Sequence, residues 1–477
     1  MLEGLEITEI NLSGLERTLR IDSDFYGRKN LNVLKLIAKN KPKPLTDFVR
    51  VSDGNHASIS NYYSREGVPY YRGGDIYNFY IEQSPSPLRI PESIYNIGTM
   101  KRSHLRKGDV LISIVGAIIG NLSLVKTDAK ATCSCKLAIL RPKTIQPELL
   151  AMFLQSKFGQ NQVQKFRRGT GQTGLILEDF DQLLIPTYSD DISLAITKAV
   201  SDAFTLLEQS KQTYSQAENL LLEEVGLQDF EPSQEPVNIK SFKDSFGTSG
   251  RLDAEYYQKK YEQVVEKVKS KTYDTLANIV DIKKSIEPGS KHYVEDGLPF
   301  MRVADLSKNG LSTPQKFLSQ SFVQANTDKI EGLKPKKGTI LFSKDASVGI
   351  AYHLRQDYEG ITSGAILHLT IQDKTQVIPE YLTLVLNSKV VQMQAERDAG
   401  GSIILHWRSS EIANVVVPII DYTKQQQIAD LIEQSFSLKK QSEHLLDVAK
   451  RAVEIAIEDN EQVALDYIQH EVAAYES

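Results

Sequence analysis

The stretch RIDSDFYGRK at residues 20–29 returns later in the chain as RLDAEYYQKK at residues 251–260. Four of the ten positions are identical, and five more exchange residues of similar size or charge. A second copy of this specific motif of charged and aromatic residues indicates an internal repeat. The pair therefore predicts that two parts of the chain share one fold.

The correspondence continues in order and at a nearly constant offset along the chain. The matching stretches are EGVPYYRGGDI (66–76) with DGLPFMRVADL (296–306), LRKGDVLIS (105–113) with LKPKKGTILFS (333–343), PELLAMFLQSK (147–157) with PEYLTLVLNSK (379–389), and LLIPTY (183–188) with VVVPII (415–420). An ordered set of matches of this kind indicates a tandem duplication.

Composition limits the class of protein. A chain of 477 residues fits two to four domains, and 41% hydrophobic with 25% charged residues is typical of soluble globular proteins. The opening MLEGLEITEI is acidic, unlike a signal peptide. The longest apolar run, residues 110–120, is too short to span a bilayer. We therefore expect a cytoplasmic protein without a membrane partner.

The two cysteines, Cys133 and Cys135, are separated by one residue in a strand-like segment. This pair cannot complete a tetrahedral zinc site, and no histidine cluster with ligand spacing accompanies it. We expect no metal and two reduced thiols in or near a core.

Charge is distributed unevenly around a net charge of −5. From Glu454 to the C-terminus there are seven acidic residues and no Lys or Arg, whereas basic residues gather in RKNLNVLKLIAKNKPK, MKRSHLRKG, KFRRG and LKPKKG. Separate surfaces for separate partners would explain this pattern, and so would ordinary solvated faces.

Each copy has the same predicted order of elements. Short β-rich runs come first, at residues 110–115 and 137–140 in one copy and at 339–342 and 365–369 in the other. A short helix follows, opened by Pro147-Glu148 or Pro379-Glu380. Lys107-Gly108 and Lys337-Gly338 are predicted to form turns that lead into strands.

A long helix closes each copy. Its predicted seam is Ile196, Ala199, Ala203, Leu206, Ser210, Thr213, Ala217, Leu220 and Glu224 in the first copy, and Ile428, Leu431, Ser435, Leu438, Ser442, Leu445, Ala449, Ala452 and Ala456 in the second. Each helix should be roughly 45 to 55 Å long. Packing on its own domain is possible for such a stripe, but the length favours packing of the two helices on each other, antiparallel if the copies are related by a pseudo-two-fold axis.

These residues resemble the specificity (S) subunit of type I restriction-modification systems. The resemblance rests on RIDSDFY and RLDAEYY at the start of each half, on GVPYYRGGDI with GLPFMRVADL, on KGDVLIS with KGTILFS, and on the IP or VP before each long helix. It covers essentially the whole chain.

The resemblance implies an α+β fold with two tandem target-recognition domains, separated by two long antiparallel coiled-coil helices in a pseudo-two-fold duplication. The expected segments are target-recognition domain 1 (1–187), a central spacer helix (188–228), target-recognition domain 2 (229–419), a distal spacer helix (420–458) and an acidic C-terminal tail (459–477). The tail could extend the second helix or dock on a partner.

The resemblance also implies partners and cofactors. Each domain would read one half of a split double-stranded DNA target, and the helices would set the spacing. The helices would bind adenine methyltransferase subunits, two of them, and through them a restriction and translocation subunit. S-adenosylmethionine, ATP and Mg are expected on these partners and no cofactor on this chain.

Candidate DNA-binding residues are polar side chains near glycine-rich turns. Arg pairs well with guanine and Asn or Gln with adenine, while glycines let the backbone approach a duplex. The candidates are Asn55, His56, Arg65, Arg72, Arg167, Arg168, Thr170, Gln172 and Thr173 in the first copy, and Lys291, His292, Arg302, Lys344, Ser402, His406, Trp407 and Arg408 in the second. Trp407, the only Trp, fits a core position equally well.

No catalytic motif is found. The chain has no G-x-x-x-x-G-K-[ST] loop, no H-E-x-x-H, no dinucleotide fingerprint and no Asn/Asp-Pro-Pro-Tyr/Phe motif. We therefore expect a non-catalytic subunit. The alternatives are a duplicated enzyme with its active site between the copies, a protein scaffold that binds no DNA, and a specificity subunit of a system that methylates without cutting.

Overall fold

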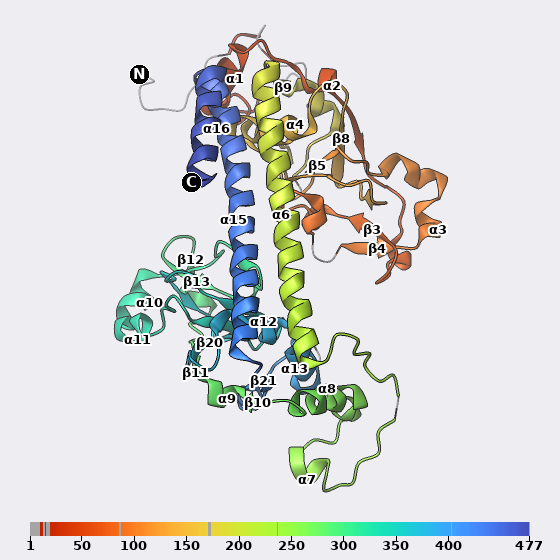
Figure 1. Ribbon diagram of the computed structural model, residues 1–477. Helices are drawn as coiled ribbons and strands as arrows, with labels where there is room; N and C mark the ends of the chain where they lie inside the picture. The colour runs from red at the N-terminus through yellow and green to blue at the C-terminus, as the bar shows by residue number, and fades with distance from the viewer. Residues whose placement is uncertain are drawn as a thin grey trace. The chain divides into compact units, whose positions relative to one another are not determined.

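The computed structural model describes residues 10–12, 15, 20–84, 87–169, 173–235, 237–401 and 403–476. The chain divides into two compact units (Figure 1). Unit 1 comprises Met1–Leu207 and Lys440–Ser477, and unit 2 comprises Glu208–Lys439. Each is described by itself.

The elements of unit 1 occur in the following order. They are α1 (Arg28–Ala38), β1 (Lys43–Pro44), α2 (Leu45–Phe48), β2 (Val49–Asp53), β3 (Val68–Tyr71), β4 (Leu88–Ile90), α3 (Glu92–Tyr95), β5 (Val110–Ser113), β6 (Leu122–Leu124), β7 (Thr132–Cys133), β8 (Leu137–Pro142), α4 (Pro147–Gln155), α5 (Lys157–Lys165), β9 (Leu184–Ile185), the first part of α6 (Asp190–Val225), the last part of α15 (Tyr422–Glu458) and α16 (Glu461–Glu476).

Unit 2 contains the remaining parts of α6 and α15 and the elements between them. These are α7 (Phe246–Ser249), α8 (Lys259–Lys269), β10 (Tyr273–Thr275), α9 (Leu276–Ile279), β11 (Val280–Lys284), β12 (Tyr293–Val294), β13 (Leu298–Met301), β14 (Leu306–Ser307), β15 (Gly310–Leu311), β16 (Phe317–Leu318), α10 (Gln320–Ala325), α11 (Thr327–Glu331), β17 (Ile340–Ser343), β18 (Ala351–His353), β19 (Ile361–Thr362), β20 (Ile366–Ile371), α12 (Pro379–Asn387), α13 (Lys389–Asp398), α14 (Ser409–Ala413) and β21 (Val416–Pro418).

The main sheet of unit 1 is antiparallel, with the strand order β2-β8-β5-β6. Alternate residues of β5 point to opposite faces, as strand geometry requires. Val110 and Ile112 join the large core with α4, α5 and α6, whereas Leu111 packs in a second core with Ile139 and Cys133. The sheet is therefore covered on both faces, which explains why its strands are almost continuously apolar.

The main sheet of unit 2 repeats this plan, with the strand order β11-β20-β17-β18. Its register is equivalent, since Val110 pairs with Leu140 in unit 1 and Ile340 pairs with Leu369 in unit 2. Ile340 and Phe342 face the core with α12 and α15, and Leu341 faces the other side. The predicted strand runs are confirmed in both units.

A smaller sheet accompanies each main sheet. In unit 1 its order is β4-β3-β7, and in unit 2 it is β12-β16-β13-β19. Both contain one parallel pair at the same place, β3 with β7 and β13 with β19. Unit 2 adds the hairpin β14-β15. The two units therefore share a backbone plan and differ in peripheral strands.

The predicted turns and short helices are confirmed. Gly108 and Gly338, each two residues before the start of β5 or β17, adopt φ values of +88° and +90°, a conformation that favours glycine. Pro147 and Pro379 each lie in the first turn of a helix, α4 or α12, where the missing N–H of proline has no cost.

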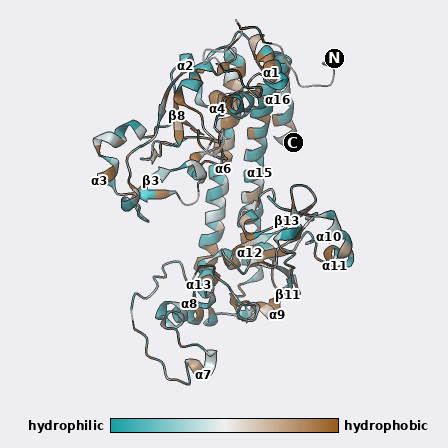
Figure 2. Ribbon diagram, turned by 180° about the vertical axis from the view of Figure 1, so that it is seen from behind, coloured by the Kyte–Doolittle hydropathy of each residue, from teal (hydrophilic) through white to brown (hydrophobic). Residues whose placement is uncertain are grey.

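The long helices α6 and α15 have 36 and 37 residues, or about 54 Å at 1.5 Å per residue. Every residue of the predicted seam is buried or partly buried, and the hydropathy colouring shows both kinds of residue along each helix (Figure 2). In unit 1, Ser442 donates to the carbonyl of Ala203 at 2.6 Å. In unit 2, the Ser210 and Ser435 hydroxyls each donate to the other's carbonyl at 2.8 Å.

Other contacts give the direction of these helices within each unit. Lys424, near the start of α15, pairs with Glu224, near the end of α6, at 2.9 Å in unit 2. In unit 1, the backbone N–H of Ser189, just before α6, donates to Glu461, just after α15. Within each unit the two helices therefore run antiparallel, as predicted, and their small seam residues permit close contact.

The acidic C-terminal segment forms a separate helix, α16, that lies beside α15 (Figure 1). Ala464 and Ile468 are buried in the large core of unit 1. The segment therefore neither continues α15 nor lies free of its own domain. Asp466 is exposed, whereas Glu461 and Glu471 are partly buried.

Cys133 is buried and Cys135 partly buried, and both are free thiols, as predicted. Burial raises the pKa of Cys133 far above its ordinary value. Among the described residues, no helix is both long and apolar enough to cross a membrane.

Candidate nucleic-acid interface

The carboxyl ends of β2, β3 and β5 meet at one edge of unit 1, around the segment 133–136. The N–H of Asn55 donates to the carbonyl of Cys133 at 2.8 Å, and the N–H of Ser134 donates to the carbonyl of Tyr71 at 2.9 Å. Ile114 donates to the carbonyl of Lys136 at 3.1 Å. We call this arrangement strand-end edge 1. The backbone N–H and carbonyl groups at this edge hydrogen-bond to one another. They therefore need no side-chain partners, and the side chains beyond the strand ends can face outward.

The same arrangement occurs in unit 2, around the segment 362–365. Ser363 donates to the carbonyl of Met301 at 2.8 Å, and Lys344 donates to the carbonyl of Ala365 at 2.9 Å. A parallel bridge joins Ile286 to Ser363, as one joins Asn55 to Ser134 in unit 1. We call this strand-end edge 2.

Each predicted glycine-rich segment forms a loop against its strand-end edge. Loop 1 (residues 167–169 and 173–176) bridges Arg168 to Gly174, and Gly174 to Val115 just beyond β5. Loop 2 (residues 399–401 and 403–408) bridges Gly400 to His406, and His406 to Asp345 just beyond β17. The two loops therefore occupy equivalent places beside the two edges.

The structure places most candidates of the first copy near edge 1. Four are exposed, namely His56, Arg65, Arg72 and Arg167, and two are partly buried, Arg168 and Thr173. Thr170 and Gln172 lie outside the described residues.

Asn55 differs from the other candidates of the first copy because it is buried. Its side chain donates to and accepts from the backbone of Ala57, at 2.9 and 3.0 Å. This side chain therefore holds a turn and is unavailable to DNA, which corrects its prediction as a base contact.

Arg302 and Lys344 lie at edge 2 and the described candidates from 406 to 408 lie in loop 2, whereas Lys291 and His292 lie beside the Phe322 ring and Ser319, away from the edge. Lys291, His406 and Arg408 are exposed, whereas His292, Arg302 and Lys344 are partly buried. Ser402 lies outside the described residues. Trp407 is completely buried and packs on Phe342 with ring centroids 5.7 Å apart. Of the two alternatives for Trp407, the core position holds and a DNA contact does not.

Carboxylates orient several of the basic side chains. In unit 1, Asp53 bonds both His56 and Arg102, and Asp179 bonds Arg168. In unit 2, Asp345 lies 2.6 Å from the ammonium of Lys344 and 2.8 Å from Nδ1 of His406. Held in this way, a basic group loses less conformational freedom when it binds a phosphate or a base edge.

Arg102, Lys136 and Lys284 belong to these edges and were missed in the sequence. All three are exposed, Lys136 within the segment 133–136 and Lys284 at the end of β11. Lys136 lies in a strand-like segment, and no feature of the neighbouring residues indicated that it contacts DNA. For Lys284, the signal was the alignment of its strand with β2, whose last residue is Asp53.

One group of residues in unit 2 has the chemistry of a metal site. His353, Glu380 and Glu433 present ligand atoms within 4.8 Å of one another. Arg355, however, donates to Glu433 at 2.8 Å, and a guanidinium at that place opposes a cation. Because an ion pair already uses Glu433, we assign no metal to the group.

A family model of the type I restriction modification DNA specificity domain matches residues 266–447, which include most of unit 2. Residues 266–447 therefore carry this domain, and the predicted resemblance is confirmed.

Two of the solved structures that are similar to this chain are the following. The S subunit of a type I restriction-modification system from M. genitalium shares 14% identity over 90% of this chain and 95% of that chain, with a TM-score of 0.37. The HsdS subunit from Thermoanaerobacter tengcongensis shares 17% identity over 88% and 96%, with a TM-score of 0.26. No curated protein sequence matches the chain.

Proposed function

We propose that this chain is the DNA sequence-specificity subunit of a type I restriction-modification complex and that it reads a target in two separate parts. Unit 2 carries the DNA specificity domain, and we infer that unit 1 is a second domain of the same kind. One unit would read each part of the target.

The observation that carries this proposal is the repetition of the strand-end edge with different outward residues. Backbone bonds at the edge recur in both units, from Ser134 to Tyr71 in one and from Ser363 to Met301 in the other. The residues that end equivalent strands differ, however: Asp53 ends β2 and Lys284 ends β11. A constant frame with variable outward groups suits two readers of different sequences.

The proposed chemistry of recognition follows from the residue types. Exposed Lys and Arg side chains would bind phosphates and supply most of the affinity, with the salt dependence that counterion release imposes. The loops would bring Arg167 and Arg408, both exposed, to the base edges, which carry the sequence information.

We assign no reaction to this chain. In the proposal it binds and positions DNA for adenine methyltransferase subunits, two of them, which would dock on the long helices and carry S-adenosylmethionine. A restriction subunit that uses ATP and Mg would join through them.

The test is to co-express the chain with the methyltransferase encoded beside it, in a host that lacks other adenine methylation, and to map N6-methyladenine across the genome. A culture without the chain is the first control. We expect a motif of two parts with a fixed gap that disappears in this control. Unchanged methylation by an active methyltransferase without the chain would refute the proposal.

Charge reversals sharpen the same experiment. Lys136→Glu at edge 1 and Lys284→Glu at edge 2 should each weaken methylation, because each places a carboxylate beside the DNA phosphates. Lys336→Glu changes an exposed residue paired with Asp357, away from both edges, and is the matched control. A protein scaffold that binds no DNA would respond equally to all three.

A further inference from the structure

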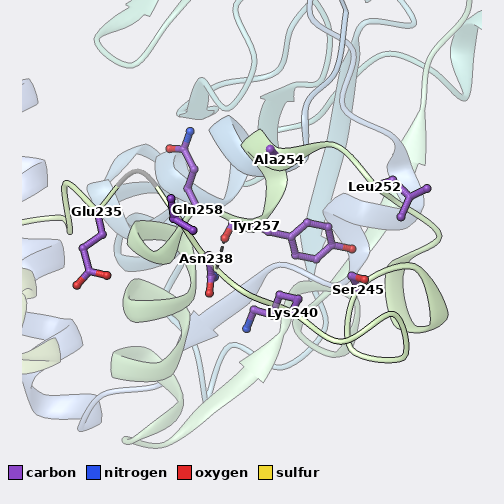
Figure 3. A pocket seen from close by; sticks show the side chains of 9 residues that line it. Glu235, Asn238, Lys240, Ser245, Leu252, Ala254, Tyr257 and Gln258 are labelled. Atoms are coloured by element: carbon purple, nitrogen blue, oxygen red, sulfur yellow. Dashed lines mark hydrogen bonds between the residues drawn. The ribbon is translucent and has the colours of Figure 1, made fainter.

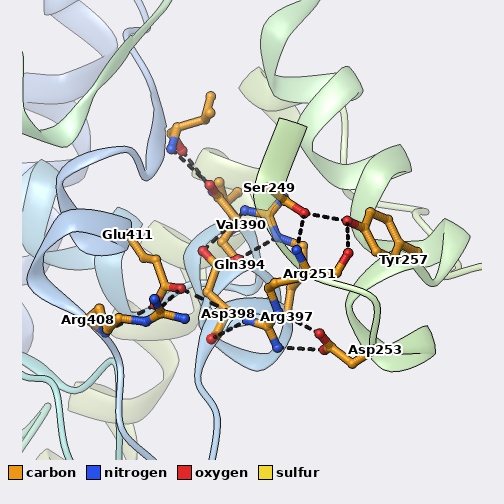
Figure 4. Close-up of polar contacts among 11 residues, drawn as sticks. Ser249, Arg251, Asp253, Tyr257, Val390, Gln394, Arg397, Asp398, Arg408 and Glu411 are labelled. Atoms are coloured by element: carbon orange, nitrogen blue, oxygen red, sulfur yellow. Dashed lines mark hydrogen bonds and ion pairs between the residues drawn. The ribbon is translucent and has the colours of Figure 1, made fainter. Parts of the chain in front are cut away.

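The repeated sequence motif that opens each half contains an Arg-x-Asp pair, and in unit 2 this pair forms a bidentate ion pair (Figure 4). Nε and Nη2 of Arg251 donate to the two carboxylate oxygens of Asp253 at 2.8 and 2.6 Å. The guanidinium also lies over the ring of Tyr256, 4.5 Å from its centroid. The remaining nitrogen, Nη1, donates to the backbone carbonyl of Asp398 at 3.0 Å.

That carbonyl belongs to the last residue of α13, where loop 2 begins. The final carbonyls of a helix lack partners within the helix and carry the negative end of its dipole, so a cation suits them. The guanidinium also lies 4.0 Å from Glu411. Glu411 in turn accepts from the N–H of Arg408 at 3.2 Å, where loop 2 ends. One arginine therefore reaches both ends of loop 2.

Unit 1 contains the same device. Nε and Nη2 of Arg20 donate to Asp22 at 2.8 and 2.9 Å, and the guanidinium lies 4.4 Å from the centroid of Phe25. Nη1 donates to the carbonyl of Phe166 at 3.4 Å, at the end of α5 where loop 1 begins.

The other end of loop 1 is held by Asp179, which accepts from the N–H of Ile176 at 2.9 Å and bonds Arg168. Burial raises the pKa of Asp179, and the charges of Arg168 and Arg20 act in the opposite direction. Arg20 therefore bonds the start of loop 1 directly, and Asp179 holds its end.

The backbone of Arg251 is fixed from the opposite side. Its N–H donates to the Ser249 hydroxyl at 3.0 Å, and its carbonyl accepts from the Tyr257 hydroxyl at 3.0 Å. Tyr257 also lines a cavity of about 350 Å³ (Figure 3). With its backbone fixed on that side, Arg251 directs its guanidinium toward the root of loop 2.

We propose that Arg20 and Arg251 are positioning residues: Arg251 clamps both ends of loop 2, Arg20 clamps the start of loop 1, and each thereby holds its loop in the conformation that reads DNA. This inference rests on the proposed function. It also explains why the sequence motif occurs twice: each reader needs its own clamp, whereas the loop residues are free to differ.

The test uses Arg251→Lys and Arg20→Lys in the full chain with its methyltransferase. Lysine keeps the positive charge but cannot bond a carboxylate, a carbonyl and a ring face at once. Arg251→Lys should make one part of the methylated motif degenerate, and Arg20→Lys should affect only the other part. The melting temperature should stay within about 2 °C of the parent value.

Hydrogen exchange tests the clamp without DNA. The amides of Gly400 and His406 bond each other's carbonyls across loop 2, and in Arg251→Lys they should exchange about tenfold faster. Amides of β17 and β20 should keep their rates, and Arg20→Lys should show the same effect at Arg168 and Gly174. Lys336→Gln is the matched control.

Three outcomes would overturn the clamp. The loop amides and the motif could both stay unchanged in the variants, or both parts of the motif could degrade together. Exchange could also accelerate throughout unit 2, in which case Arg251 would simply stabilise the unit. A parent chain without a split motif would refute the proposed function instead, and the exchange rates would still report on the clamp.

Discussion

Unit 1 and unit 2 agree in their backbone pairing and differ in the side chains that this pairing presents. Ile114 and Lys344 make equivalent strand-end bonds, and Leu175 and Trp407 occupy equivalent loop positions, since their N–H groups donate to those same two residues at 2.9 and 2.8 Å. The comparison teaches that the frame depends on main-chain bonds and tolerates large changes of side chain.

The two units also differ in how they attach to the long helices. In unit 1, Lys126 pairs with Glu148 at 2.8 Å and faces Phe204 of α6 at 5.7 Å. In unit 2, Arg355 pairs with Glu433 and lies 3.6 Å from the Phe436 ring of α15. Both attachments place a cation on an aromatic ring, but only the unit 1 pair is almost entirely buried, at 12% and 11% exposure.

The largest expected effect is in the core of unit 2. Trp407→Ala should destabilise unit 2 by about 4 kcal/mol, because it leaves a cavity beneath loop 2. Trp407→Leu, which installs the residue type of unit 1, should cost about half as much. Hydrogen exchange of unit 2 peptides would measure both, with unit 1 peptides as the internal control. Equal costs for the two variants would show that the units do not share this position.

The buried pair of unit 1 comes next. Lys126→Met should cost about 3 kcal/mol, since it leaves the Glu148 carboxylate buried without a partner. In unit 2, Arg355→Met should cost about 1 kcal/mol, because Glu433 is half exposed and water can solvate it. Exchange in each unit would give the two values. A larger loss of stability for Arg355→Met than for Lys126→Met would contradict the proposed difference between the two attachments.

A third comparison concerns pH. His368 of β20 is buried, its Nε2 lies 2.9 Å from the Thr362 hydroxyl, and burial with the nearby Lys283 charge lowers its pKa to about 4. Unit 1 has Ile139 at the equivalent register position. The folded state binds a proton less readily than the unfolded chain, whose histidine titrates near 6.5.

His368 therefore leaves stability unaffected above pH 6.5, and unit 2 loses stability as the pH falls from 6.5 to 4, by up to roughly 3 kcal/mol. The double variant His368→Ile, Thr362→Cys installs the pair of unit 1 and should remove this loss. The measurement is the unfolding free energy of unit 2 across this pH range. An unchanged pH profile in the variant would assign the loss to other groups.

Much of the fold was predictable because it depends on patterns that are local or repeated. The seam from Ile196 to Glu224 and the turn at Gly108 follow from periodicity and backbone chemistry. Burial was not predictable residue by residue: Asn55 and Trp407 have the chemistry of DNA contacts, but long-range pairing places both inside. Lys136 was missed for the converse reason, because only the meeting of three strand ends around its segment puts it on an edge. Arg20 also bonds the backbone carbonyl of Phe166, a partner that no side-chain pattern reveals.

The smallest effect concerns the loops themselves. Arg167→Ala and Arg408→Ala each remove one exposed guanidinium and should reduce DNA affinity by about 1 kcal/mol, with little change in stability. Glu411 holds Arg408 at 3.3 Å, and this orientation favours a directed contact with one base. Arg408→Ala should therefore relax one position of the motif, measured by methylation mapping.

If Arg167 contacts a phosphate, its loss should instead weaken binding to all sequences alike and lower the salt dependence by about one ion. Salt titration of binding separates the two cases, and identical behaviour of both variants would mean that the loops differ in sequence without differing in how they read DNA.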